Sequence, residues 1–166
     1  DVFASADEAT MAKVSEFALE PAVFASNTLV IVVPAGNPKK VSTLADLTDV
    51  VTVLCAPEVP CGAASGKLLT AADVTVDAAS LEQNVTAVLT KVAAGEADAG
   101  LVYATDVVGR SDVASVAPDG ADEVVNRYPI AALKDAANPD AAAAFIAFVR
   151  SEAGRKILAG HGFGAP

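Results

Sequence analysis

The chain is 166 residues long, which allows one compact domain or two small lobes. Its formal net charge of −10 at pH 7 argues against nucleic acid or an anionic membrane surface as a partner, because both need clustered basic residues. Hydrophobic residues make up 53% of the chain and aromatic residues only 5%, so alanine, valine and leucine must form the core. Such aliphatic cores suit closely packed α/β layers.

Strand-like and helix-like segments alternate along the whole chain. Apolar, β-branched runs predict strands at 2–4, 24–33, 51–55, 74–76, 99–103, 113–116 and 124–133. Helical spacing and capping residues predict helices that begin at Asp7, Ser42, Cys61, Ser80, Asn138 and Ser151. This alternation predicts an α/β fold with a mostly parallel sheet flanked by helices.

The segment from Cys55 to Ser65 contains the first candidate binding feature. An apolar run ends there in a loop with two prolines, and a helix rich in small residues begins. The first N–H groups of a helix have no partner within it and lie at the positive end of its dipole. They can therefore hold an anion without any lysine or arginine.

Three residues lie at the end of a predicted strand or at the start of the helix that follows one. They are Cys61, Val85 in the helix opened by Ser80, and Tyr103 at the end of a buried run. In parallel α/β sheets ligands bind at the carboxyl ends of strands, so these residues can gather neutral donors around one anion. The alternative is that they are ordinary strand ends and capped helices, which every α/β protein has.

Six stretches carry a family resemblance that spans essentially the whole chain in order. They are DVFASAD at 1–7, NTLVIVVP at 27–34, VPCG at 59–62, ADAGLVY at 97–103, YPIA at 128–131 and GFGAP at 162–166. With these stretches the chain resembles the periplasmic molybdate-binding proteins of ABC transporters. The resemblance implies a type II periplasmic-binding fold of two lobes, with mixed, mostly parallel sheets flanked by helices and an oxyanion held in the cleft.

The same resemblance implies lobe boundaries and ligand contacts. The first lobe would comprise residues 1–33 and 127–166, and the second lobe residues 34–126. The backbone N–H groups of Cys61 and Val85 and the hydroxyl of Tyr103 would bind the oxyanion. No residue would be catalytic, and none would bind a metal directly, because molybdenum would enter only as its oxyanion.

In function, the resemblance implies a solute-binding protein and not an enzyme. It would need no cofactor, would capture molybdate or tungstate, and would deliver it to an ABC transporter permease from the periplasm or the extracellular side of the cell envelope. The family normally begins with a further strand, helix and strand carrying two serine-type contacts, which this sequence lacks. We therefore expect an incomplete first lobe, exposed apolar surface and self-association or a missing partner segment, with a truncated binding remnant or sensor as an alternative function.

The two cysteines leave three interpretations open. A disulfide between Cys55 and Cys61 fits their short separation and an exported protein. Two buried thiols are the second interpretation. In the third, the helix N-terminus lowers the pKa of the Cys61 thiol for a thiol-dependent enzyme, although the only histidine, His161, lies in the glycine-rich tail and supplies no evident base.

Overall fold

The structure is a computed structural model that describes residues 1–166 and divides into two compact units. Unit 1 contains Asp1–Asn27 and Asn126–Pro166, and unit 2 contains Thr28–Val125. The boundary expected near residue 33 falls inside a strand, β3 (Leu29–Pro34), that pairs with two other strands of unit 2. The division between the units therefore lies at residues 27 and 28, before this strand begins.

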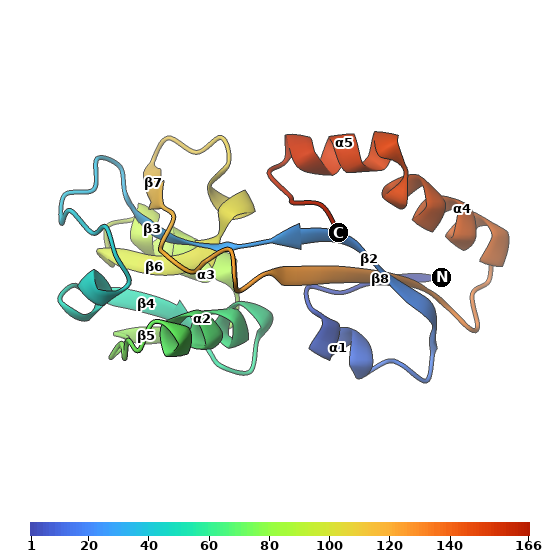
Figure 1. Ribbon diagram of the computed structural model, residues 1–166, viewed down its shortest axis with the longest axis horizontal. Coiled ribbons are helices and arrows are strands. Elements are labelled where there is room, and N and C mark those ends of the chain that lie inside the picture. The colour runs from blue at the N-terminus through green and yellow to red at the C-terminus, as the bar shows by residue number, and fades with distance from the viewer. The chain divides into compact units, whose positions relative to one another are not determined.

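Unit 1 is built on a three-stranded antiparallel sheet in the order β1-β8-β2 (Figure 1). Its elements are β1 (Val2–Ala4), α1 (Glu8–Ala12), β2 (Ala18–Asn27), β8 (Asn126–Leu133), α4 (Pro139–Arg150) and α5 (Glu152–Gly160). Figure 1 shows α4 and α5 on one side of the sheet and α1 on the other. The strand at 2–4 is confirmed.

The helix starts predicted for unit 1 are also confirmed. The Asp7 carboxylate accepts a hydrogen bond from the N–H of Thr10 at 2.6 Å. Pro139 occupies the first turn of α4, where its missing N–H costs no helical bond. The hydroxyl oxygen of Ser151 accepts from the N–H of Gly154 at 3.2 Å and caps α5.

The core of unit 1 is small. Met11, Ala18 and Ala131 form its buried cluster, and α1 ends before Val14, which packs at the margin of that cluster. Several large apolar side chains are about half exposed, namely Phe17, Leu19, Phe145, Phe148 and Ile157. Unit 1 therefore presents apolar surface, and self-association through it stays a prediction.

Unit 2 has a five-stranded sheet in the order β5-β4-β6-β3-β7. Its elements are β3 (Leu29–Pro34), the 3₁₀ helix η1 (Ala45–Thr48), β4 (Thr52–Cys55), α2 (Pro60–Ala71), β5 (Ser80–Glu82), α3 (Val85–Ala93), β6 (Ala99–Tyr103), the 3₁₀ helix η2 (Ala104–Val107) and β7 (Val113–Val116). β3 and β6 are buried almost along their whole length, as their uninterrupted apolar runs predict. The strands at 99–103 and 113–116 are confirmed.

The prediction of mixed sheets is confirmed, but the prediction of mostly parallel pairing was wrong. Only β4 with β5 and β4 with β6 are parallel, and the other four pairings are antiparallel. Parallel neighbours need a long crossover, which α2 and α3 provide between β4, β5 and β6. β3 is antiparallel to both of its neighbours, β6 and β7, so it alone runs against the direction of the other four strands.

Two other assignments from the sequence were wrong. The predicted strand at 74–76 is absent, and residues Ser80–Glu82 form β5 instead of opening a helix. The predicted capping box fails because Ser80 pairs with Val53 of β4, a contact distant in sequence that the local pattern cannot reveal. The single strand predicted at 24–33 is divided between β2, which ends at Asn27, and β3, which begins at Leu29.

The described helices include none that is both long enough and apolar enough to cross a membrane.

We expect a leucine in the central part of the unit 2 sheet to contribute strongly to stability. Leu101 of β6 is 0% exposed, whereas Leu81 of β5 is 55% exposed. Leu101→Ala should lower the free energy of unfolding by about 2–5 kcal/mol, because it leaves a cavity in the core. The matched change Leu81→Ala should cost less than about 0.5 kcal/mol in the same urea denaturation experiment. Equal losses in both variants would contradict this packing.

Candidate functional site

The carboxyl ends of β4, β5 and β6 lie at one edge of the unit 2 sheet. Cys55 at the end of β4 is level with Glu82 at the end of β5, and Val53 is level with Gly100 of β6. α2 follows β4, α3 follows β5 and η2 follows β6. The structure therefore brings the first turns of α2 and α3 and the end of β6 to the same edge of unit 2, as parallel pairing requires.

The start of α2 supplies backbone donors that the helix does not use. Val59 is its extended N-cap residue and makes no side-chain capping bond. The first helical hydrogen bond runs from the N–H of Ala63 to the carbonyl oxygen of Val59 at 3.0 Å. Since Pro60 has no N–H, the amides of Cys61 and Gly62 are the donors left in the first turn.

The start of α2 is fixed tightly to the end of β4. A disulfide bond joins Cys55, the last residue of β4, to Cys61 in the first turn of α2. Gly62 lies so near the backbone of Ala56 that a Cβ atom at this position would overlap its carbonyl oxygen. Both cysteines are buried and neither is free, so the interpretations with free thiols, including the reactive Cys61 thiolate, are wrong for this structure.

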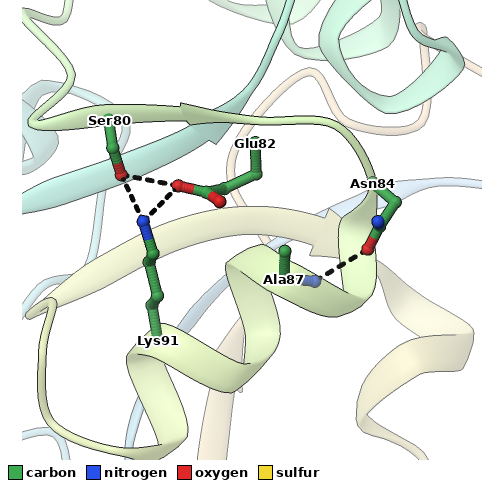
Figure 2. A network of polar contacts seen from close by, with 5 residues as sticks. All are labelled: Ser80, Glu82, Asn84, Ala87 and Lys91. Atoms are coloured by element: carbon green, nitrogen blue, oxygen red, sulfur yellow. Dashed lines mark hydrogen bonds and ion pairs between the residues drawn. The ribbon is translucent and has the colours of Figure 1, made fainter.

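The start of α3 also has backbone donors that the helix does not use, but unlike α2 it has a side-chain cap (Figure 2). Asn84 is extended, and its Oδ1 accepts from the N–H of Ala87 at 2.9 Å. This cap occupies one amide of the first turn and leaves those of Val85 and Thr86 as donors. Neither α2 nor α3 has an acidic residue in its first turn, so the positive end of each helix dipole is not neutralised there.

The loops before the two helices are bonded to each other. The N–H of Ala56, after β4, donates to the carbonyl oxygen of Glu82 at 2.8 Å. The Gln83 side-chain amide donates to a carboxylate oxygen of Glu58 at 3.3 Å. These bonds connect the segment before α2 with the segment before α3, so the two sets of free amides are held in one local structure.

Tyr103 ends β6 at the same sheet edge. It is 6% exposed and pairs with Leu29 of β3. Its backbone N–H donates to a carboxylate oxygen of Asp106 at 2.9 Å. Burial raises the pKa of Asp106, and the hydrogen bond from the Tyr103 amide opposes that rise.

This edge of unit 2 suits an anion better than a cation. Its available donors are neutral backbone amides at helix starts, which favour negative charge. No group of three or more histidine, cysteine, aspartate or glutamate side chains gathers anywhere in residues 1–166 in a way that could hold a metal ion. The arrangement can bind and orient an oxyanion.

Sequence reasoning predicted Cys61, Val85 and Tyr103 as contacts but missed the side chains that hold α3. Asn84 is the cap of α3, and Ser80, Glu82 and Lys91 form a polar network between β5 and the last turn of the helix (Figure 2). An asparagine immediately before an apolar helical run is a capping signal and could have been recognised. The network could not, because its members are distributed over a strand and a helix.

The whole chain fits one protein family. The family model described as bacterial extracellular solute-binding protein matches residues 1–164. The chain belongs to this family. Solute binding, and not catalysis, is what defines the family, so the expectation that the chain is not an enzyme is confirmed.

One relative in sequence and two solved structures are similar to this chain. Molybdate-binding protein ModA from Mycobacterium tuberculosis is 46% identical, over 100% of this chain and 66% of that protein, so the chain spans about two thirds of this relative's length. The substrate-binding domain assigned to a molybdenum ABC transporter from Clostridium difficile has a TM-score of 0.78 and 27% identity, over 100% of this chain and 77% of that one. The periplasmic molybdate-binding protein of Azotobacter vinelandii has a TM-score of 0.81 at 19% identity, over 100% and 78% of the two chains, and supports the fold.

We expect Gly62 to be needed for the close approach of α2 to β4. Gly62→Ala should destabilise the protein by about 1–3 kcal/mol, because the new methyl group forces the helix start away from Ala56. Gly66, in the same helix, has no atom within 4 Å of its Cβ position. Gly66→Ala should therefore stabilise the protein by about 0.5–1 kcal/mol through helix propensity. Thermal denaturation of both variants measures the difference, and a stable Gly62→Ala variant would contradict the packing described.

Proposed function

We propose that this protein captures a tetrahedral oxyanion, molybdate or tungstate, and that unit 2 supplies three of the contacts. The donors are the backbone N–H groups of Cys61 and Val85 and the hydroxyl of Tyr103. The observation that carries the proposal is the gathering of these residues at one sheet edge, in a chain 46% identical to molybdate-binding protein ModA of Mycobacterium tuberculosis.

Neutral donors are sufficient for a dianion at such a site. The unused amides at each helix start donate directly, and the helix dipoles add positive potential. Hydrogen bonds to an ionised acceptor are about twice as strong as neutral ones, and they strengthen further where water is excluded. Capture of the oxyanion therefore needs no lysine or arginine and leaves its chemistry unchanged.

Selection between oxyanions then depends on size. Molybdate, tungstate and sulfate share their charge and tetrahedral shape, so the charge of the site cannot separate them. A rigid set of donors spaced for the larger ions leaves some donors unpaired when sulfate binds, and an unpaired donor in a dry site costs about 1–3 kcal/mol. We therefore propose a preference for molybdate and tungstate over sulfate.

The relatives support the proposed place of action and partner. The family is described as extracellular, and the similar domain from Clostridium difficile is assigned to a molybdenum ABC transporter. We place this protein in the periplasm or on the outer side of the cell envelope, where it delivers the oxyanion to the permease of an ABC transporter.

Isothermal titration of the chain with sodium molybdate tests the function, with tungstate and sulfate as competitors. Val85→Pro is the sharpest variant, because proline fits the first helical position and removes the N–H without breaking a helical hydrogen bond. Asn84 is already extended, as a residue before proline should be. We expect Val85→Pro to weaken molybdate binding by about 10- to 100-fold, the value of one hydrogen bond to a charged group.

Val85→Ala is the matched control for this titration. It shortens the same partly buried side chain but keeps the backbone donor. Its molybdate affinity should stay within about threefold of the parent chain, which corresponds to less than about 1 kcal/mol. Equal affinities for Val85→Pro and Val85→Ala would exclude the Val85 amide as a contact. A folded parent chain that binds no oxyanion would favour the binding-remnant alternative.

Tyr103→Phe tests the side-chain donor separately. The change removes a single hydroxyl from a buried ring that stays in place. Loss of its hydrogen bond should weaken molybdate binding by about 1–3 kcal/mol in the same titration. Circular dichroism and the melting temperature, measured without ligand, establish that the variant is folded. An unchanged affinity in a folded variant would show that Tyr103 is not a ligand.

A further inference from the structure

A polar network connects β5 to the last turn of α3, the helix that begins at the proposed oxyanion contact Val85 (Figure 2). Lys91 Nζ of α3 contacts a carboxylate oxygen of Glu82 at 2.5 Å and donates to the hydroxyl of Ser80 at 3.0 Å. The Ser80 hydroxyl donates to the same Glu82 oxygen at 2.7 Å. Three polar groups thus close a ring between the edge strand and the helix.

Glu82 lies close to the segments that lead into both α3 and α2. Glu82 ends β5, and only Gln83 and Asn84 separate it from Val85 at the start of α3. Its carbonyl oxygen also accepts from the N–H of Ala56, in the segment that leads to α2. Glu82 therefore connects the network to the segment before α3 by the chain itself, and to the segment before α2 by its carbonyl oxygen.

Both apolar packing and directional bonds hold α3 on the sheet. Its inner face is formed by Val88, Leu89 and Val92, which are buried in the unit 2 core. The hydrophobic effect behind these contacts is non-directional. The bonds from Lys91 to β5 are directional, so they add a restraint on the position of α3 along its axis.

The ion pair is also sheltered enough to persist. The side chain of Glu82 is 14% exposed and that of Lys91 is 34% exposed. The hydrogen bonds from Lys91 and Ser80 lower the pKa of Glu82, so the carboxylate stays ionised and paired at neutral pH. The ion pair stabilises the folded protein fully above the ordinary pKa of a glutamate, and this stabilisation is lost as the pH falls through the lowered pKa of Glu82.

We propose that Lys91, with Glu82 and Ser80, is a positioning residue for the oxyanion site. The network sets the place of the Val85 and Thr86 amides relative to those of α2, and thereby sets affinity. Lys91 also compensates the charge of Glu82, the carboxylate nearest in sequence to the start of α3. This inference rests on the proposed function, since the amides it positions are the proposed contacts.

The test combines molybdate titration with backbone amide relaxation by NMR in the ligand-free protein. Lys91→Met should weaken molybdate binding by about three- to tenfold, a range set by a partly sheltered ion pair. The order parameters of the Val85 and Thr86 amides should fall in the same variant. Lys91→Arg, which keeps the charge and the donors, should restore both readouts, whereas loss of a merely structural side chain would not move the amides of the first turn.

Arg110→Met is the matched control. Arg110 forms the other ion pair of unit 2, with Asp112, beside the start of β7. Val113 of β7 pairs with Pro34 at the end of β3, and β3 is antiparallel to β6, so this ion pair lies near the opposite edge of the sheet. Its removal should change neither molybdate affinity nor the Val85 amide.

The outcomes separate this inference from the proposed function. Unchanged binding in folded Lys91→Met would overturn the positioning role while the function stands. If the parent chain binds no oxyanion, the proposed function fails, and the order parameters alone decide whether the network positions α3. Glu82→Gln provides a second variant should Lys91→Met not fold, and unchanged amides in it would equally overturn the inference.

Discussion

The parallel pairing of β4 with β5 and β6 is the constraint on which the candidate site depends. Helices that connect parallel strands all begin at the same edge of the sheet. Cys61, Val85 and Tyr103 are far apart in sequence, and this pairing is what gathers the ends of their elements. β3 and β7 extend the sheet antiparallel and add no helix start at that edge. The site is therefore composed mainly of backbone donors and owes little to charged side chains.

In the proposed function, a dianion must reach these donors in a protein of formal net charge −10. Salt screens distant charges beyond about 8–10 Å, so the local arrangement decides the outcome. The first turns of α2 and α3 contain no acid. The nearby carboxylates have hydrogen-bond partners of their own: Lys91 pairs with Glu82, the Gln83 amide donates to Glu58, and the Tyr103 amide donates to Asp106. An acidic surface is thus compatible with an anion site, because short-range hydrogen bonds outweigh a screened field.

Local signals predicted much of the fold, and non-local pairing explains most of the errors. The run at 99–103 was recognisable because a strand buried on both faces is apolar throughout. Ser80–Glu82 was misassigned because its sequence imitates a helix cap, whereas its pairing with β4 depends on residues far away in the chain. Tyr103 and Cys61 could be chosen from strand ends and a family resemblance together. The partners of Lys91 could not, since nothing in the sequence indicates where its side chain ends.

The two helix starts are held by different physical means. The start of α2 is fixed covalently by the disulfide between Cys55 and Cys61 and by the close contact at Gly62. The start of α3 is capped by Asn84, and the network of Lys91, which salt and acid can weaken, joins the last turn of the helix to β5. Donors fixed before the ligand arrives cost less ordering when it binds. Since the disulfide restrains the start of α2 more strongly than polar bonds restrain α3, the proposed oxyanion site depends most on the position of α3.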